Sequence, residues 1–291
     1  MKIYENLTLD EERALYGLSG ARVKNCVFAG PADGESALKE CRDLQVEDCR
    51  FELRYPLWHW KGGELAGAEM TPSCRAALWY DEDVRISRSR LHGIKALREC
   101  RNVKIQECDV LSQEFGWFCR NVDIKDTALE SEYPFMRCEN LHIDGLKMKG
   151  KYSFQYVQNA VISHSVLDTK DAFWHSENVT VTDSVVRGEY LGWYSKNLRL
   201  VRCQIIGTQP LCYAQGLTLQ ECTMQDTDLA FERSDVKADV RGEILSVKNP
   251  KSGWIRADKI GKVISDGQSA AGSSCRISCA EPAPCKEAVC L

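Results

Sequence analysis

The sequence predicts an all-β fold, a parallel β-helix, and three observations lead to this prediction. One pattern returns eight times between residues 81 and 241, and each copy starts 19 residues after the previous one. Positions 4 and 6 of a copy are apolar, as in Val84 and Ile86 or Val103 and Ile105, which is the period-two alternation of a strand. Position 3 is Asn in six copies, beginning with Asn102.

A repeat of this length is too short to bury a core alone, so the copies are expected to stack. Because the repeat contains strand patterns and no convincing helix, each copy is interpreted as one coil of three short strands. Equivalent positions would then lie about 4.8 Å apart along the axis. The Asn column is expected to form an asparagine ladder, since Asn tolerates left-handed corners and its amides can hydrogen-bond along the axis.

Length and composition favour one elongated domain over residues 1–265. The 291 residues are 44% hydrophobic, and the net charge of −4 shows no basic stripe, so we expect no nucleic-acid partner. The N-terminus is polar and acidic, and no apolar run of 18 residues occurs. These features predict a cytoplasmic protein with no membrane partner.

Fifteen cysteines stand mainly in two columns, at positions 1 and 9 of the repeat. Ser and Thr occupy the same columns in other copies, which indicates small inward-facing residues and reduced thiols. A disulfide or metal role stays open as the alternative, although parallel side chains would strain a bridge. A Cys-containing tail, residues 266–291, is expected to be disordered, and its cysteine spacing matches no common metal pair.

Before the regular copies, three segments carry separate expectations. Residues 7–18 combine Asp10, a candidate N-cap, with a short amphipathic pattern, which predicts a short N-terminal capping helix over the open end of the sheet. Residues 20–28 and 41–51 carry the strand signature of two irregular coils. Residues 53–80 break the register and are rich in Trp, so they form either the edge of a binding groove or a coil with different corners.

The candidate binding residues lie in the second half of each copy. Position 17 is apolar or small and is expected to face inward, so strand alternation predicts that position 18 faces outward. An outward aromatic column, spaced by the coil rise, could stack on the sugar rings of a β-linked glycan; the alternative is that another segment or a second subunit covers it. The candidate substrate-binding residues are Trp79, Trp117, Trp174, Trp193 and Tyr213.

The candidate catalytic residues are Asp171, His175 and Glu189. Positions 15 and 19 share the parity of inward position 17, so either a bulge turns their side chains into a groove or their charges lie partly buried. A carboxylate pair one coil apart would suit a retaining glycoside hydrolase, but Asp171 and Glu189 occupy adjacent positions and could face opposite sides. Five histidines and no phosphate-binding loop predict no metal and no cofactor.

Several long motifs carry a resemblance to a known family. They are ADGESALKEC, RYPLWHW, CRAALWY, HGIKALREC, FGWFCRN, KYSFQYV, DTKDAFWH, GEYLGWYS and GTQPLC. With these motifs, residues 3–265 resemble the bacterial family catalogued as domain of unknown function 3737. That family is similar to right-handed pectin-lyase-like β-helices, which implies a right-handed helix here. The resemblance implies no established reaction and no catalytic residues.

These observations give two functional hypotheses. The first is a carbohydrate-binding or carbohydrate-active protein, a glycoside hydrolase or lyase among the options, whose partner is an oligo- or polysaccharide. The second is a non-catalytic scaffold or assembly protein that uses the aromatic column as a protein interface, with a homo-oligomer as one outcome. Both rest partly on analogy between folds.

Overall fold

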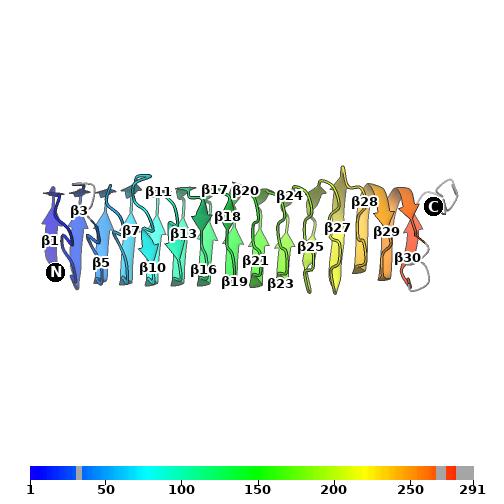
Figure 1. Ribbon diagram of the computed structural model, residues 1–291, viewed down its shortest axis with the longest axis horizontal. Coiled ribbons are helices and arrows are strands. Elements are labelled where there is room, and N and C mark those ends of the chain that lie inside the picture. The colour runs from blue at the N-terminus through cyan, green and yellow to red at the C-terminus, as the bar shows by residue number, and fades with distance from the viewer. Residues whose placement is uncertain (31–34, 267–272, 280–291) are drawn as a thin grey trace. The chain divides into compact units, whose positions relative to one another are not determined.

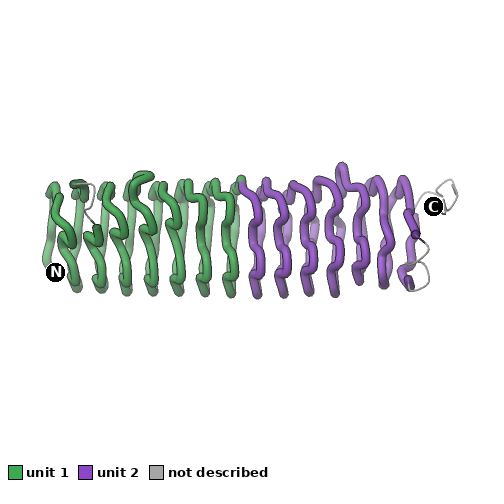
Figure 2. Tube along the Cα trace, viewed as in Figure 1, with its two compact units in different colours: residues 1–149 green, residues 150–291 purple. Residues whose placement is uncertain are grey.

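The chain forms a parallel β-solenoid with coils of about 19 residues. The computed structural model describes residues 1–30, 35–266 and 273–279. Paired residues are 19 positions apart in most coils, as Val84 and Val103 are. Two compact units, residues 1–149 and 150–291, make up the chain (Figure 2). In each unit the strands of successive coils lie side by side (Figure 1). The predicted solenoid is confirmed, while its right-handedness and the single domain over residues 1–265 stay predictions.

Unit 1 contains the strands of the first coils. They are β1 (Lys2–Glu5), β2 (Thr8–Leu9), β3 (Ala21–Lys24), β4 (Val27–Phe28), β5 (Arg42–Glu47), β6 (Arg50–Phe51), β7 (Lys61–Ala66), β8 (Glu69–Met70), β9 (Leu78–Trp79), β10 (Glu82–Ser87), β11 (Arg90–His92), β12 (Leu97–Arg98), β13 (Arg101–Gln106), β14 (Asp109–Leu111), β15 (Glu114–Phe115), β16 (Arg120–Lys125), β17 (Ala128–Ser131), β18 (Tyr133–Pro134), β19 (Glu139–Asp144) and, ending at the boundary, β20 (Lys147–Gly150).

Unit 2 contains the remaining strands, of which β27, β28 and β29 are the longest. They are β21 (Gln158–Ser163), β22 (Val166–Asp168), β23 (Glu177–Thr182), β24 (Val185–Arg187), β25 (Arg199–Val201), β26 (Gln204–Ile206), β27 (Leu217–Gln225), β28 (Asp235–Lys248), β29 (Ser252–Ile264) and β30 (Arg276–Cys279).

Each regular coil has three sides. The first side is a six-residue strand, such as β10 or β13, and the second is a shorter strand, such as β11 or β14. The third side consists mostly of turns, with two-residue strands such as β9 and β12 in some coils. Each strand pairs in parallel with its equivalent in the next coil, so a position of the repeat becomes a column of side chains.

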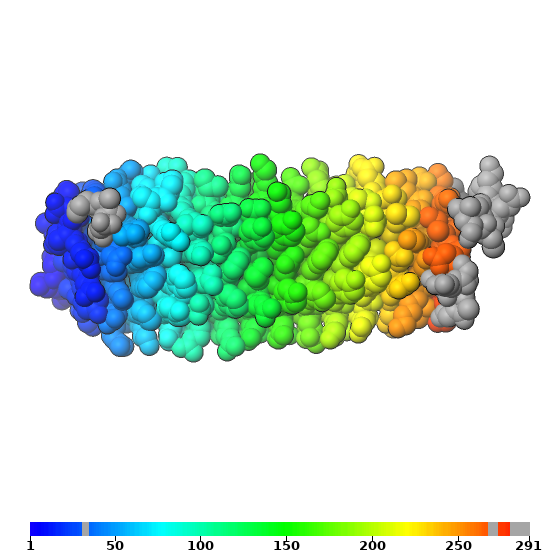
Figure 3. All heavy atoms as spheres, viewed as in Figure 1, coloured from blue at the N-terminus to red at the C-terminus, as the bar shows by residue number. Residues whose placement is uncertain are grey.

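The core fills the inside of these coils. Val84 and Ile86 are each 1% exposed, so the first side faces inward through positions 4 and 6, as the alternation predicts. Figure 3 shows the side chains of successive coils packed against one another within each unit. The free cysteines from Cys26 to Cys222 are buried, while Cys275 and Cys279 near the end of the described chain are half-buried. Burial raises the pKa of the Cys41 thiol to about 11, so such thiols remain protonated and pack as small apolar groups.

The Asn column lies at an exposed corner and has positive φ angles of 53° to 57°. In each unit, an Asn side-chain amide donates to the side-chain oxygen one coil earlier. In unit 1 these bonds join Asn102 to Asp83, Asn121 to Asn102 and Asn140 to Asn121, at 2.8, 2.8 and 2.9 Å. In unit 2 they join Asn178 to Asn159 and Asn197 to Asn178, at 3.1 and 2.9 Å.

Replacing Asn121 by alanine should lower the free energy of unfolding by about 1–2 kcal/mol. The change removes both amide bonds of this residue and places a Cβ-bearing residue without a local hydrogen bond at φ 55°. Urea denaturation followed by circular dichroism measures the loss. Asn121→Gly is the control, because glycine accepts this backbone and loses only the amide bonds. Equal losses in both variants would show that backbone strain contributes nothing.

The predicted capping helix is wrong. Residues 7–18 instead continue the coil pattern, with β2 followed by turns, and the described residues contain no helix. Arg13 and Leu15 have φ angles of 57° and 58°, which a right-handed helix excludes. The backbone N–H groups of Arg13 and Gly17 donate to the next coil, to Glu35 and Lys39, at 2.9 and 3.0 Å. Bonding between coils therefore replaces the bonds that a helix would make within the segment.

Two other irregular regions, residues 53–80 and the Cys-containing tail, also contain strands that pair with neighbouring coils. Residues 53–80 form a coil with different corners, because β7 pairs with β10 at a spacing of 21 residues instead of 19. Inside the Cys-containing tail, β30 is a strand that pairs in parallel with β29. Cys285 and Cys290 lie outside the described residues, and so does the prediction of disorder for that part of the tail.

Candidate functional site

In the coils of unit 2 the third side, positions 15 to 19, has a positive φ at every second residue. In one coil these residues are Asp171, Phe173 and His175, at 54°, 61° and 53°. Side chains on such a backbone do not alternate between two faces as they do on a strand. Position 17 faces inward as predicted, since Phe173 is 1% exposed. Position 19 faces solvent, as Tyr194 does at 43% exposure. The expectation that position 19 shares the inward direction of position 17 is therefore wrong.

The three candidate catalytic residues have different environments. Asp171 is buried, and this burial raises the pKa of its carboxyl group. Glu189 forms an ion pair with Lys170 at 2.9 Å, and His175 lies exposed between two tyrosine rings. Within the described chain, no hydrogen bond or ion pair joins the side chains of Asp171, His175 and Glu189 to one another. A catalytic role for them stays a prediction.

The tryptophans of position 18 are half-buried, so they face outward only in part. The indole N–H groups of three of them donate to a backbone carbonyl of the next coil. The bonds run from Trp117 to Tyr133, from Trp174 to Tyr190 and from Trp193 to Gln209, at 2.6, 2.7 and 2.8 Å. Trp79 instead donates to the Glu99 carboxylate at 3.2 Å. These indoles therefore help to close the third side.

Unit 2 carries a row of four rings at position 19, which we call the ring ladder: Tyr156, His175 and Tyr194, which are exposed, and Tyr213, which is half-buried. The three successive pairs each have ring centroids 5.0 Å apart, and their planes differ by 7°, 7° and 13°. Beside this row, Trp174 and Trp193 stack at 5.5 Å with planes 4° apart. Rings stacked in this way cover each other's faces, so the ladder presents ring edges to solvent.

The hydroxyl groups of Tyr194 and Tyr213 are available to a ligand. In the part of the chain that the structure describes, the hydroxyl groups of Tyr194 and Tyr213 make no hydrogen bond. Burial, and then the nearby Glu232 carboxylate, raise the pKa of the Tyr213 phenol, which therefore stays protonated. Tyr213, a predicted binding residue, lies in this row, and sequence reasoning missed its partners Tyr156 and Tyr194.

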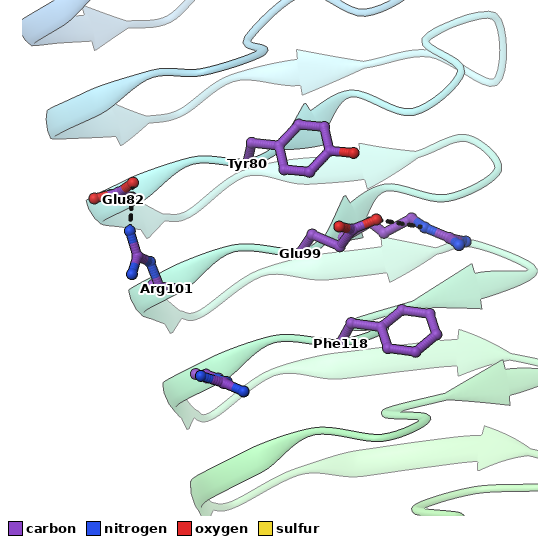
Figure 4. A pocket seen from close by; sticks show the side chains of 7 residues that line it. Tyr80, Glu82, Glu99, Arg101 and Phe118 are labelled. Carbon is purple, nitrogen blue, oxygen red and sulfur yellow. Dashed lines mark hydrogen bonds and ion pairs between the residues drawn. The ribbon is translucent and has the colours of Figure 1, made fainter.

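Unit 1 has a pocket of about 580 Å³ in the same columns. The side chains of Tyr80, Glu99 and Phe118, all at position 19, lie one below another along its length (Figure 4). Arg98, Glu82, Arg101 and Arg120 complete the lining. None of these seven residues was predicted from the sequence, although the column Tyr, Glu, Phe interrupts the aromatic pattern at this point.

The charges around the pocket are paired. Arg101 donates to Glu82 at 2.7 Å, which lowers the pKa of the Glu82 carboxyl, and Arg120 donates to Glu139 at 3.2 Å. Arg98 donates to Glu114 at 3.4 Å, and its Nε lies 3.6 Å from Glu99. The guanidinium of Arg98 also lies over three aromatic rings: those of Trp79, Trp117 and Phe118, at 5.0, 5.1 and 5.4 Å. These contacts hold the Arg98 side chain in place.

Two searches over the described residues give negative results. No cluster of three or more His, Cys, Asp or Glu side chains has a geometry that could hold a metal ion. Among those same residues there is no helix of the length and apolar character that crossing a membrane requires.

Comparison with known proteins gives one family and several distant structures. Residues 2–278 match the model of the family described as "Protein of unknown function (DUF3737)". Comparison with curated protein sequences gives no match. Among solved structures, the chain is similar to the surface protein and adhesin PfbA of Streptococcus pneumoniae, at 9% identity and a TM-score of 0.42, covering 82% of this chain and 90% of that one.

Two carbohydrate-active proteins also match. The A-module of the mannuronan C-5 epimerase AlgE4 from Azotobacter vinelandii has 9% identity and a TM-score of 0.32, covering 91% of this chain and 90% of that one. The catalytic domain of a GH87 α-1,3-glucanase, solved with nigerose, has 8% identity and a TM-score of 0.30, covering 90% and 64%. Likenesses this distant say nothing about ligand or activity.

Proposed function

This chain belongs to the DUF3737 family of proteins of unknown function, and we propose that it binds an extended saccharide along the ring ladder of unit 2. The ladder, as defined above, is the row of Tyr156, His175, Tyr194 and Tyr213. The proposal concerns carbohydrate binding and includes no catalytic activity. Hydrolase or lyase activity and a cytoplasmic location stay predictions.

The observation that carries the proposal is the constant ring spacing of 5.0 Å. An extended β-linked glycan repeats at nearly the same distance as the coils, about 4.8 Å. Edge groups of successive rings can then bond equivalent hydroxyls of successive sugars. Tyr hydroxyls both donate and accept, and an imidazole offers one or two ring nitrogens, so such a row suits a polyhydroxylated chain.

This proposal differs from the platform that the sequence predicts. Trp174 and Trp193 stack on each other, and their indole N–H groups bond to the next coil. The faces that contact each other are therefore not free to stack on a sugar. In the proposed site they support the ladder, since the edge of the Trp193 ring packs against Tyr213 at 5.2 Å. Trp79 and Trp117, in unit 1, have no part in it.

Removing one ladder hydroxyl should weaken saccharide binding. In Tyr194→Phe the ring stack stays intact and one hydrogen bond to the ligand is lost, so the dissociation constant should rise roughly five-fold. A polysaccharide is first selected from a panel of plant and bacterial glycans, and calorimetry then compares the wild type with Tyr194→Phe and Tyr213→Phe. Affinity should also increase with glycan length up to about four sugar units, one for each ring.

The matched control is Tyr190→Phe, because Tyr190 packs edge-on against Trp193 but lies outside the ladder. It should leave the affinity unchanged. If no glycan binds, or if the Tyr194 and Tyr213 variants bind as tightly as the wild type, the proposal fails. Concentration-dependent self-association that Tyr194→Phe or Tyr194→Ala abolishes would instead favour the scaffold hypothesis, in which the ladder is a protein interface.

A further inference from the structure

We propose that a row of polar side chains beside the ring ladder makes unit 2 selective for neutral glycans over charged ones. The row lies at position 2 of the repeat, and we call it the polar rail: Gln158, Glu177, Lys196 and Gln215. This choice of ligand rests on the proposed function, because it names the class of saccharide that the ladder accepts and the residues that decide it.

The polar rail runs along the ring ladder. Each rail residue follows a ladder residue by two positions, as Lys196 follows Tyr194. These two side chains are exposed, while Ser195 between them is 0% exposed, and the Cα atoms of Tyr194 and Lys196 are at most about 7 Å apart. Parallel pairing joins the successive rail residues, Gln158 to Glu177, Glu177 to Lys196 and Lys196 to Gln215. The rail therefore repeats at the coil rise of about 4.8 Å, as the ladder does.

Positions 19 and 2 also share one surface in unit 1. Apart from Arg98, the lining of the pocket of about 580 Å³ consists of residues at these two positions, with Tyr80 and Glu82 from one coil and Phe118 and Arg120 from another (Figure 4). Side chains at positions 19 and 2 are therefore close enough to contact a single ligand.

The charges of the polar rail are unpaired, unlike those at position 2 in unit 1. There Arg101 donates to Glu82, one coil earlier, at 2.7 Å. Glu177 and Lys196 are likewise opposite charges in adjacent coils, but neither side chain makes a hydrogen bond or an ion pair with any residue that the structure describes. The same is true of the two glutamine side chains of the rail. All four side chains are therefore available to a ligand.

The order of charges along the rail favours a neutral ligand. Glu177 and Lys196 stand one coil rise apart, so the charges of the rail sum to zero. A polyuronate, with a carboxylate on every sugar, would be attracted at Lys196 and repelled at Glu177, and a polymer of amino sugars would meet the reverse. Neutral hydroxyl groups suit each position, because the carboxylate accepts, the ammonium donates and the amides do both.

Calorimetry of the whole protein with β-1,4-linked tetrasaccharides measures this selectivity. The neutral probes are the tetramers of glucose and mannose, and the charged probes are the tetramers of mannuronate and glucosamine. At 0.15 M salt the screening length is about 8 Å, so charges near the bound sugar dominate. We expect at least one neutral tetramer to bind the wild type at least ten-fold more tightly than either charged tetramer does.

Two variants should change the selectivity in opposite directions. Glu177→Gln removes the repulsion of carboxylates and keeps an acceptor, so mannuronate tetramer should bind about ten-fold more tightly than to the wild type. Lys196→Gln should have the same effect on the glucosamine tetramer. Affinity for the neutral tetramer should change by less than about three-fold in both variants, since the new amides still bond to hydroxyl groups.

The matched control is Asp168→Asn, which also removes one negative charge from unit 2 but lies in β22, on the second side of the coil. It should leave the affinity for mannuronate tetramer unchanged, and circular dichroism checks the folding of all variants. The inference is overturned if no tetramer binds, if a charged tetramer binds the wild type as tightly as the neutral ones, or if the two glutamine variants keep the wild-type order of affinities. Polysaccharide binding that depends on the Tyr194 hydroxyl would stand in each of these cases, so the two proposals fail separately.

Discussion

Gly188→Ala should destabilise the protein by on the order of 4 kcal/mol, enough to prevent folding of unit 2 if that unit is marginally stable. The backbone of Gly188 has φ +145°, a conformation that residues with a Cβ rarely adopt. A Cβ built there would overlap the backbone carbonyl oxygen of Thr169, one coil earlier. Because that oxygen belongs to the backbone of a packed coil, no side-chain rotation can relieve the overlap.

The loss is measured by urea denaturation followed by circular dichroism. Gly242→Ala provides the matched control, since Gly242 also lies in unit 2 and has φ +84° but has open space where the Cβ would go. Its cost should be only about 1–2 kcal/mol, from the backbone conformation alone. Similar losses in both variants would mean that the close approach of the coils at Gly188 has no energetic effect.

This close approach is a property of the stack that one copy of the repeat does not reveal. Position 13 is occupied by Thr169, Gly188 and Gly207 in successive coils, and a Cβ at Gly207 would in turn overlap the carbonyl oxygen of Gly188. Since the same position is Ser112, Ser131 and Asp226 in other copies, the sequence does not indicate that Gly188 and Gly207 are indispensable.

The first side of the coils is the part that the sequence predicts well. Its residues form true strands, so period-two alternation translates directly into burial, as at Val84 and Ile86. The 19-residue period likewise becomes the register of pairing. Such patterns are informative because the backbone conformation is regular and the buried face is continuous.

The third side shows why the rest could not be predicted. In unit 2 its φ angles alternate in sign from residue to residue, so spacing along the sequence does not give side-chain direction. The amphipathic pattern of residues 7–18 misleads for a related reason, because a turn-rich coil also buries residues at irregular intervals. Asp171 and His175 look like a pair in KDAFWH, yet one is buried and the other is exposed in a ring stack.

The orientation of the aromatic rings is a second feature that the sequence does not predict. The sequence shows that aromatic residues recur at positions 18 and 19, but whether their faces or edges meet solvent depends on side-chain rotation. In unit 2 the rings stack along the column and present edges, while in unit 1 Glu99 interrupts the stack between Tyr80 and Phe118. One substitution in a column therefore changes the kind of surface that it presents.

Replacing Asp81 by serine should stabilise the protein at neutral and alkaline pH. Asp81 is 1% exposed at position 1, a column of cysteines in the coils that follow, and burial raises the pKa of its carboxyl well above the usual range. Its Oδ1 accepts the backbone N–H of Trp60 at 2.8 Å, while its Oδ2 is buried without a partner among the described residues. A buried group left unsatisfied in this way costs about 1–3 kcal/mol.

The pH dependence follows from the direction of the pKa shift. Below the pKa of the unfolded chain, about 3.9 for Asp, both states are protonated and Asp81 contributes no pH dependence. As the pH rises above that value the unfolded state loses its proton first, so it binds fewer protons and the folded state loses stability. This continues until the pH passes the raised pKa of folded Asp81, after which the deficit is constant.

A serine at position 81 can accept the backbone N–H of Trp60 in place of the Asp81 carboxylate. Ser234 makes the same kind of bond, because its hydroxyl accepts the backbone N–H of Ala214, in an earlier coil, at 2.9 Å. Asp81→Ser should therefore gain about 1–3 kcal/mol at pH 8 and show a gain that shrinks steadily as the pH falls toward 4. Asp81→Cys, which extends the thiol column of Cys100 and Cys119, should behave alike. Parallel urea titrations from pH 4 to pH 8 measure the difference, and a gain independent of pH would show that the buried carboxyl is not its source.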